Sequence, residues 1–150
     1  MTPLVLVHGF MGGSAQWALQ APLAAQRPLI CLDLPGYGQN AALDAFDSIE
    51  ANAVWVLDQL DQRGIDQFFL LGHSMGGMIA QRLVIDHPHR ARSLTSIFSM
   101  PRFIPGDDEV SAALMGDDPE TRDERIAAGL EAARLFSGGG FPFDDDEVRA

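Results

Sequence analysis

Ser74 stands in the stretch Gly72-His73-Ser74-Met75-Gly76, which fits the pattern G-x-S-x-G. The stretch follows an apolar run typical of a strand and precedes a helical pattern, and in this context the pattern indicates a nucleophilic serine. The two flanking glycines are expected to be required because larger side chains would collide with neighbouring backbone in a sharp, strained turn. Serine alone is a poor nucleophile, so acyl transfer at Ser74 also requires a base and an oriented acid.

A second short motif, His8-Gly9-Phe10, ends the first apolar run of the chain. A loop at this place, beside the strand that leads to Ser74, can aim a backbone N–H at the oxygen that becomes negative during acyl transfer. The N–H groups of Phe10 and Met75 are the predicted donors of this oxyanion hole. The residues predicted to support the two turns are His8, Gly9, Gly72, His73 and Gly76.

Four short apolar runs, at 3–8, 28–33, 67–72 and 93–98, are predicted to be strands. Their near-continuous hydrophobicity, without strict alternation, favours a parallel sheet that is covered on both faces. Cys31 lies in the second run and is expected to be a buried thiol. As it is the only cysteine, a disulfide within the chain is excluded.

Helical patterns separate the apolar runs. One helix is expected between a capping Ser48 and Gly64, a second from Ser74 to just before Pro88, and a third after Gly12. The apolar stripe of the first consists of Ile49, Ala53, Val56, Leu57 and Leu60. Alternating strands and helices predict right-handed crossovers and an α/β fold with helices on both faces of a parallel sheet.

Three stretches, "LVHGF", "DLPGYG" and "LLGHSMGG", resemble in their order and separation the N-terminal half of an α/β-hydrolase of the esterase type. The resemblance covers residues 3–100 and implies a hydrolase core over 1–100 that acts on carboxylic ester bonds through Ser74. A less specific similarity of "GFPFDDDEVR" to methylesterase-like members implies a partial helical cap and acidic tail over 101–150. A serine at the turn disfavours the dehalogenase and epoxide-hydrolase branches, which use aspartate. Asp33 corresponds to a structural loop of the family.

The resemblance places the catalytic acid and histidine on loops after later strands, and these 150 residues are expected to lack both. His87 and His89 follow the helix that starts at Ser74 and should lie about 18 Å from it, which is too far for a base. His8 is the nearest alternative base, because adjacent parallel strands are about 4.8 Å apart. The chain alone is therefore expected to be weakly active or inactive.

The strand predicted at 93–98 is expected to be a sheet edge with unpaired backbone groups, which favours a homodimer or a complementing chain. The alternatives to an esterase are a catalytically incomplete fragment or half of a split hydrolase, and a lactonase, a C–C bond hydrolase or a cofactor-free haloperoxidase. No cofactor and no metal are expected. The acidic run 144–147 is interpreted as a solvated surface.

The charge of the chain is strongly negative and unevenly placed. The formal net charge is −11 and lysine is absent, which argues against a nucleic-acid partner. Residues 1–101 carry eight acidic and five basic side chains, net −3, whereas residues 102–150 carry thirteen and five, net −8. A helix is expected over 120–136, with Ile126, Leu130, Ala133 and Phe136 inward. No signal peptide or membrane span is evident, so we expect a cytoplasmic protein with a small-molecule ester substrate and no membrane partner.

Overall fold

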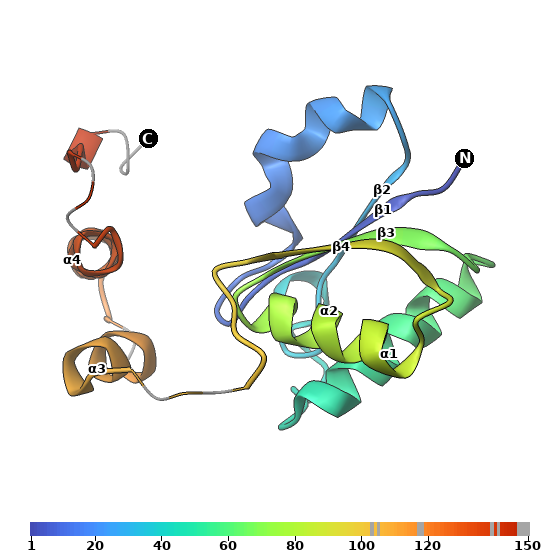
Figure 1. The fold of residues 1–150 in the computed structure, drawn as a ribbon. Coiled ribbons are helices and arrows are strands. Elements are labelled where there is room, and N and C mark those ends of the chain that lie inside the picture. The colour runs from blue at the N-terminus through green and yellow to red at the C-terminus, as the bar shows by residue number, and fades with distance from the viewer. Residues whose placement is uncertain (103, 105, 117–118, 139, 141, 147–150) are drawn as a thin grey trace. The chain divides into compact units, whose positions relative to one another are not determined.

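The computed structural model of the protein describes residues 1–102, 104, 106–116, 119–138, 140 and 142–146. The chain divides into two units, Met1–Phe103 and Ile104–Ala150 (Figure 1). Among the helices of the described residues, none has the length and apolar character that crossing a membrane requires.

A parallel sheet of four strands organises the first unit. Its strands are β1 (Leu4–Val7), β2 (Leu29–Leu32), β3 (Phe68–His73) and β4 (Ala91–Ile97), in the order β2-β1-β3-β4. In the middle of the sheet, Val5 pairs with Ile30 on one side and with Leu70 on the other. All four predicted strands are therefore confirmed, each close to its expected bounds.

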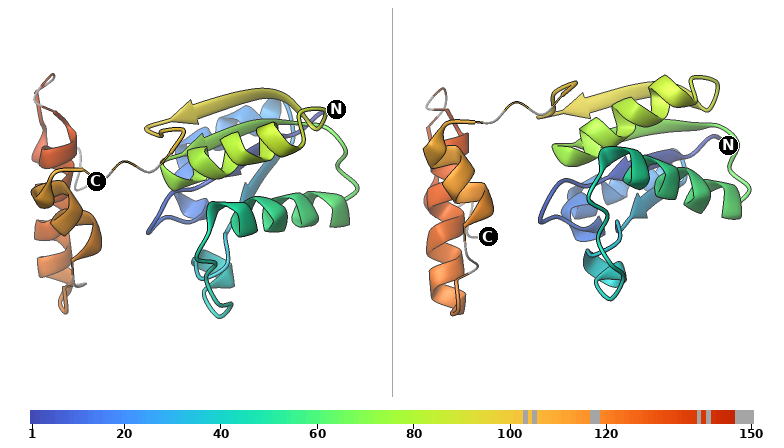
Figure 2. Two further views of the ribbon diagram at one scale, coloured as in Figure 1. Left: turned by 60° about the horizontal axis from the view of Figure 1, so that its bottom comes forward. Right: turned by 90° about the horizontal axis from the view of Figure 1, so that it is seen from below.

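Helices cover both faces of this sheet, which confirms the predicted fold class. Helices α1 (Ile49–Gln62) and α2 (Met75–Asp86) lie on one face, and η1 (Ser14–Ala25) lies on the other (Figures 1 and 2). A short turn of helix, η2 (Gly38–Asn40), follows β2.

The ends and the types of these helices follow from local chemistry. The side chain of Ser48 accepts a hydrogen bond from the N–H of Ala51 at 3.2 Å, so Ser48 caps α1 as predicted. The helix expected after Gly12 is a 3₁₀-helix, η1, which contains Pro22. Proline has no N–H to donate and disfavours a regular α-helix at this place.

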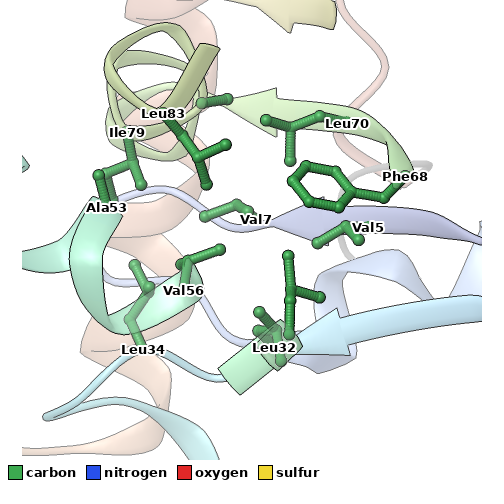
Figure 3. Packing of buried hydrophobic residues seen from close by; sticks show 12 residues of the cluster. Val5, Val7, Leu32, Leu34, Ala53, Val56, Phe68, Leu70, Ile79 and Leu83 are labelled. Carbon is green, nitrogen blue, oxygen red and sulfur yellow. The ribbon is translucent and has the colours of Figure 1, made fainter. Parts of the chain in front are cut away.

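The hydrophobic core lies between the sheet and helices α1 and α2, as Figure 3 shows. Strands β1 and β3 contribute Val5, Val7, Phe68 and Leu70, all at most 1% exposed. The remaining members come from β2 and the loop after it, from α1 and from α2: Leu32, Leu34, Ala53, Val56, Leu60, Ile79, Ala80 and Leu83. This packing fixes the ends of β1 and β3, the two strands that lead into the predicted catalytic turns.

Two expectations about burial are wrong at the edges of the sheet. Strand β4 is an outer strand of the described sheet, as expected for 93–98, but it is exposed at every position after Ala91, whereas its apolar run predicted coverage on both faces. Cys31 is exposed as well. Both β2 and β4 are outermost strands of the described sheet, and Cys31 lies on the face opposite to the buried Leu32 because side chains alternate along a strand.

Arg90 ties the start of β4 to the loop before β3. Its guanidinium donates to the carboxylate of Asp61 at 2.6 Å and to the carbonyl oxygens of Ile65 and Asp66 at 2.7 and 2.5 Å. Because Arg90 is only 9% exposed, these bonds satisfy a charge that would otherwise be costly to bury.

The second unit contains the helices α3 (Asp108–Met115) and α4 (Arg122–Phe136). Thr121 caps α4 through a reciprocal pair of hydrogen bonds with Glu124. The helix predicted over 120–136 is therefore present, with Leu130 buried and with Ile126, Ala133 and Phe136 partly buried.

Within the acidic run, Asp145 pairs with Arg134, while Glu147 lies outside the described residues. The boundary expected at 100 and the identification of the second unit as a cap stay predictions.

Candidate active site

Ser74 occupies a strained turn between β3 and α2. Its φ and ψ are 55° and −124°, a conformation that L-residues other than glycine rarely adopt. The backbone is held on both sides, because the N–H of Ser74 donates to the carbonyl oxygen of Ile97 at 2.9 Å and its own carbonyl oxygen accepts from the N–H of Gly77 at 2.9 Å. Such strain persists only where the surrounding structure enforces it, and it is concentrated at functional sites. Ser74 itself is half-buried.

Close backbone contacts explain the glycines on either side of Ser74. A Cβ placed on Gly72 would lie 2.2 Å from the carbonyl oxygen of Gly76. A Cβ placed on Gly76 would lie 2.2 Å from the carbonyl oxygen of Val7. Strands β1 and β3 and the first turn of α2 therefore meet backbone to backbone, and this contact leaves no space for a side chain at either position.

The loop after β1 lies directly beside Ser74. A Cβ placed on Gly9 would be only 2.8 Å from the Cβ of Ser74, so the backbone of Gly9 is in contact with the serine. Phe10 follows this contact and is 47% exposed. Met75 is the first residue of α2, and its N–H is one of the first-turn donors that have no partner inside a helix. Gly9 thus contacts Ser74 and Met75 follows Ser74 in the chain, while the roles of Phe10 and Met75 as oxyanion donors stay predictions.

His8 is fully buried and both of its ring nitrogens are engaged. Nδ1 donates to the carbonyl oxygen of Gly9 at 2.8 Å, and Nε2 accepts from the backbone N–H of Leu34 at 3.0 Å. The edge of the ring packs against Tyr37, with centroids 5.2 Å apart. To accept a proton from Ser74, His8 would have to break its bond to Leu34. The geometry therefore favours His8 as a support of the oxyanion loop over His8 as the base.

His73 contacts a residue that is distant from it in the sequence. Its ring stacks on that of Phe98, with centroids 6.0 Å apart and an interplanar angle of 16°. Its Nδ1 is buried and has no hydrogen-bond partner in the described part of the chain. Phe98 is a residue of this site that sequence reasoning missed, and no pattern in the apolar run that contains it distinguishes it from its neighbours.

Asp33 holds the loops after β1 and β2 together, in agreement with the structural role expected for it. Its carboxylate accepts from the N–H and the hydroxyl of Ser14 at 2.5 and 3.0 Å and from the N–H of Gln39 at 3.2 Å. Burial alone would raise the pKa of Asp33, but these hydrogen bonds to the charged form outweigh it and place the pKa below its usual value. Gly38 faces this carboxylate so closely that a Cβ there would lie 2.3 Å from it.

A base and an acid are not assembled around Ser74 by the residues that the structure describes. No hydrogen bond links the hydroxyl of Ser74 to a histidine of these residues. The carboxylate of Asp33 already accepts hydrogen bonds from Ser14 and Gln39. His87 and His89 pack against each other beyond the end of α2. Within the same described ranges, no three histidine, cysteine or acidic side chains gather as metal ligands. The local geometry provides a strained serine at the start of α2.

Comparison with known proteins identifies relatives for most of the chain. A family model described as alpha/beta hydrolase fold matches residues 2–138. A pimeloyl-[acyl-carrier protein] methyl ester esterase of Legionella pneumophila (strain Corby) is 43% identical over 103 residues, which are 68% of this chain and 40% of that protein. The esterase of the same name from Klebsiella pneumoniae (strain 342) is 35% identical over 145 residues, 87% of this chain and 54% of that protein.

Solved structures show the same architecture. The N-acyl homoserine lactonase AidH superimposes with a TM-score of 0.68 and 25% identity, covering 99% of this chain and 56% of that one. The chain spans about half the length, or less, of the curated relatives it matches.

Proposed function

The chain belongs to the α/β-hydrolase fold family, and from this premise we propose that it provides the nucleophile and the oxyanion hole of a hydrolase that acts on carboxylic ester bonds. Ser74 is the nucleophile, and the backbone N–H groups of Phe10 and Met75 bind the oxyanion. The observation that carries the proposal is the positive φ of Ser74 at the start of α2, next to the backbone of Gly9. The esterases among its relatives support the choice of an ester substrate.

The proposed reaction proceeds in two halves. A base takes the proton of the Ser74 hydroxyl while its oxygen bonds to the acyl carbon, and the carbonyl oxygen becomes an anion between the two N–H groups. The C–O bond then breaks, and the leaving alcohol takes the proton from the protonated base. Water repeats the sequence on the acyl-serine, which releases the carboxylic acid and restores Ser74. Each N–H donor is expected to contribute about 2.7–4 kcal/mol to stabilising the transition state.

The proposed reaction needs a base and an acid that come from outside the described residues. His8, the nearest alternative, already uses both ring nitrogens in hydrogen bonds. We propose that sequence outside these 150 residues supplies them, as a complementing chain would. The outer edge of β4 provides a place for added pairing, because β4 is the last strand of the described sheet and is largely exposed.

The test is reaction of the purified chain with a fluorophosphonate probe, followed by mass spectrometry to locate the adduct. An adduct on Ser74 of the wild type, with none on Ser74→Ala, is the result that supports Ser74 as the nucleophile. Hydrolysis of a p-nitrophenyl ester is measured in parallel. A folded sample without an adduct, or equal rates of ester hydrolysis by the wild type and Ser74→Ala, would contradict the assignment for the chain alone and favour a catalytically incomplete fragment.

A lactone is the second candidate substrate. It is favoured by the structural similarity to the N-acyl homoserine lactonase at 25% identity. The chemistry at Ser74 would be the same, except that the leaving alcohol stays attached to the acyl group. Comparing the hydrolysis of an N-acyl homoserine lactone with that of a methyl ester of similar length distinguishes the two, with Ser74→Ala as the control for each.

A further inference from the structure

The turn that follows β4 contacts the catalytic turn at two consecutive positions. The backbone N–H of Ser74 donates to the carbonyl oxygen of Ile97 at 2.9 Å. Phe98, the residue after Ile97, stacks on His73, the residue before Ser74. The ring centroids are 6.0 Å apart and the planes are inclined by 16°. This separation is within the range of favourable stacked pairs. The nucleophile and the residue before it are thus held by two neighbouring residues of one turn.

Phe98 adopts a backbone conformation that burial of its ring does not explain. Its φ is 48°, and among the described non-glycine residues only Met11 and Ser74 also have a positive φ. The side chain of Phe98 is 69% exposed, so little apolar surface is removed from water in return for this strain. Strained residues persist where their surroundings determine them and are concentrated at functional sites. In this conformation the ring of Phe98 stacks on that of His73.

The ring of His73 also lies close to the loop that contains Gly9. A Cβ placed on Gly9 would lie 3.4 Å from Nδ1 of His73 and 2.8 Å from the Cβ of Ser74. Since Nδ1 is buried without a hydrogen-bond partner in the described part of the chain, packing and not a hydrogen bond at this atom sets the position of the ring. The ring of His73 thus stacks on Phe98 and bounds the space beside Gly9, together with Ser74.

Residues before and after Phe98 are hydrogen-bonded to α2. The amide nitrogen of Gln81, with two N–H donors, lies within hydrogen-bond distance of the hydroxyls of Ser96 and Ser99, at 3.1 and 3.4 Å, and of the carbonyl oxygen of Met100, at 3.4 Å. These bonds hold both ends of the segment that carries Phe98. Its ring therefore rests on a fixed support when it contacts His73.

We propose that Phe98 is a positioning residue that, through His73, fixes the distance between Ser74 and the oxyanion loop at Gly9 and Phe10. The inference rests on the proposed function, because this distance matters for chemistry only if Ser74 is the nucleophile. Oxyanion donors act at about 3 Å from the reacting oxygen, so a small displacement of the loop from the serine slows the attack.

The primary test is hydrogen exchange of the Ser74 amide, measured by NMR on the whole chain. Phe98→Ala removes the ring and is expected to speed this exchange about three- to ten-fold, because opening of the turn becomes easier. Phe98→Tyr keeps the ring and is expected to exchange at the wild-type rate. Should Phe98→Ala fail to fold, Phe98→Leu replaces it, since leucine keeps the apolar volume without a flat ring and the same increase is expected.

Two controls separate positioning from a general loss of stability. Ile85→Ala removes a side chain of similar exposure, 72%, near the other end of α2 and should leave the Ser74 amide unchanged. The amide of the core residue Val56 should keep its wild-type rate in Phe98→Ala. An unchanged Ser74 amide in Phe98→Ala, or equal acceleration at Ser74 and Val56, would overturn the proposal.

Fluorophosphonate labelling of the same variants links the position to reactivity. The second-order rate of adduct formation at Ser74 is expected to fall about three- to ten-fold in Phe98→Ala and to be restored in Phe98→Tyr. If the wild type forms no adduct, the proposed function fails for the chain alone, and the exchange measurement still decides whether Phe98 positions the turn. A labelling rate that is the same in Phe98→Ala and the wild type would also overturn the proposal.

Discussion

His8 and Leu34 connect the loops that follow β1 and β2: the backbone N–H of Leu34 donates to Nε2 of His8 at 3.0 Å, and both residues are completely buried. The other nitrogen of the same ring donates to the carbonyl oxygen of Gly9, the residue in contact with Ser74. A single imidazole thus sets the path of the loop after β1 against the start of the loop after β2.

Replacing His8 by phenylalanine is expected to destabilise the protein by about 1–3 kcal/mol, because the ring volume stays while the buried N–H of Leu34 loses its acceptor. The free energy of unfolding is measured with urea. His89→Ala, a change at an exposed histidine, serves as the control and should lie within about 0.5 kcal/mol of the wild type. Equal stability of His8→Phe and the wild type would contradict the importance of this hydrogen bond.

Gly72→Ala is expected to cost about 3 kcal/mol or more, since the added methyl group would meet backbone atoms that cannot move independently. Gly129→Ala is the matched change inside α4, where a Cβ meets nothing within 4 Å, and it should stabilise the protein by about 0.5–1 kcal/mol. Both are measured as urea unfolding midpoints of the unit concerned. A tolerated Gly72→Ala would show that the contact between Gly72 and Gly76 can relax.

Ser74→Gly and Ser74→Ala both remove the hydroxyl but differ in backbone strain. Glycine adopts a positive φ without the steric cost of a Cβ, so Ser74→Gly should be more stable than Ser74→Ala by about 1 kcal/mol. Thermal unfolding of the two variants measures the difference. If the alanine variant proves equally stable, the turn is not strained in solution.

Asp33 gives the stability of the protein a specific dependence on pH. Its pKa is lower in the folded than in the unfolded protein, so its contribution is fully present above the unfolded value of about 3.9 and is lost as the pH falls through the folded value. Urea unfolding of the wild type between pH 6 and 3 should show this loss, and Asp33→Asn should show a smaller one. Asp58→Asn, at an exposed position, is the control and should retain the wild-type slope.

The strands and the turn at Ser74 could be predicted because each depends on neighbours in the sequence. Val5 and Leu70 lie in short apolar runs that are typical of strands. Ser74 lies between Gly72 and Gly76, and a side chain at either glycine would collide with backbone in the same turn. Ser48 could be identified as a cap because its partner, Ala51, is three residues away. Local spacing is sufficient for features of this kind.

Features that depend on distant parts of the chain could not be predicted. The stacking of His73 on Phe98 joins residues that are far apart in the sequence, and nothing in either segment specifies the other. Arg90 was missed for the same reason, since its hydrogen-bond partners Asp61, in α1, and Ile65, after α1, are 29 and 25 residues away in the sequence. The burial expected for Cys31 was wrong because an apolar run does not reveal whether its strand is central or outermost.

The exposed thiol of Cys31 is the only thiol of the chain and lies on a strand whose position is fixed by pairing with β1. A fluorophore or nitroxide can therefore be attached at one defined point without any other cysteine having to be removed. Partial burial and the nearby Asp33 carboxylate raise the pKa of Cys31, so alkylation is expected to be faster under mildly alkaline conditions. A probe at Cys31 would report spectroscopically on the loop that Asp33 organises, two residues away.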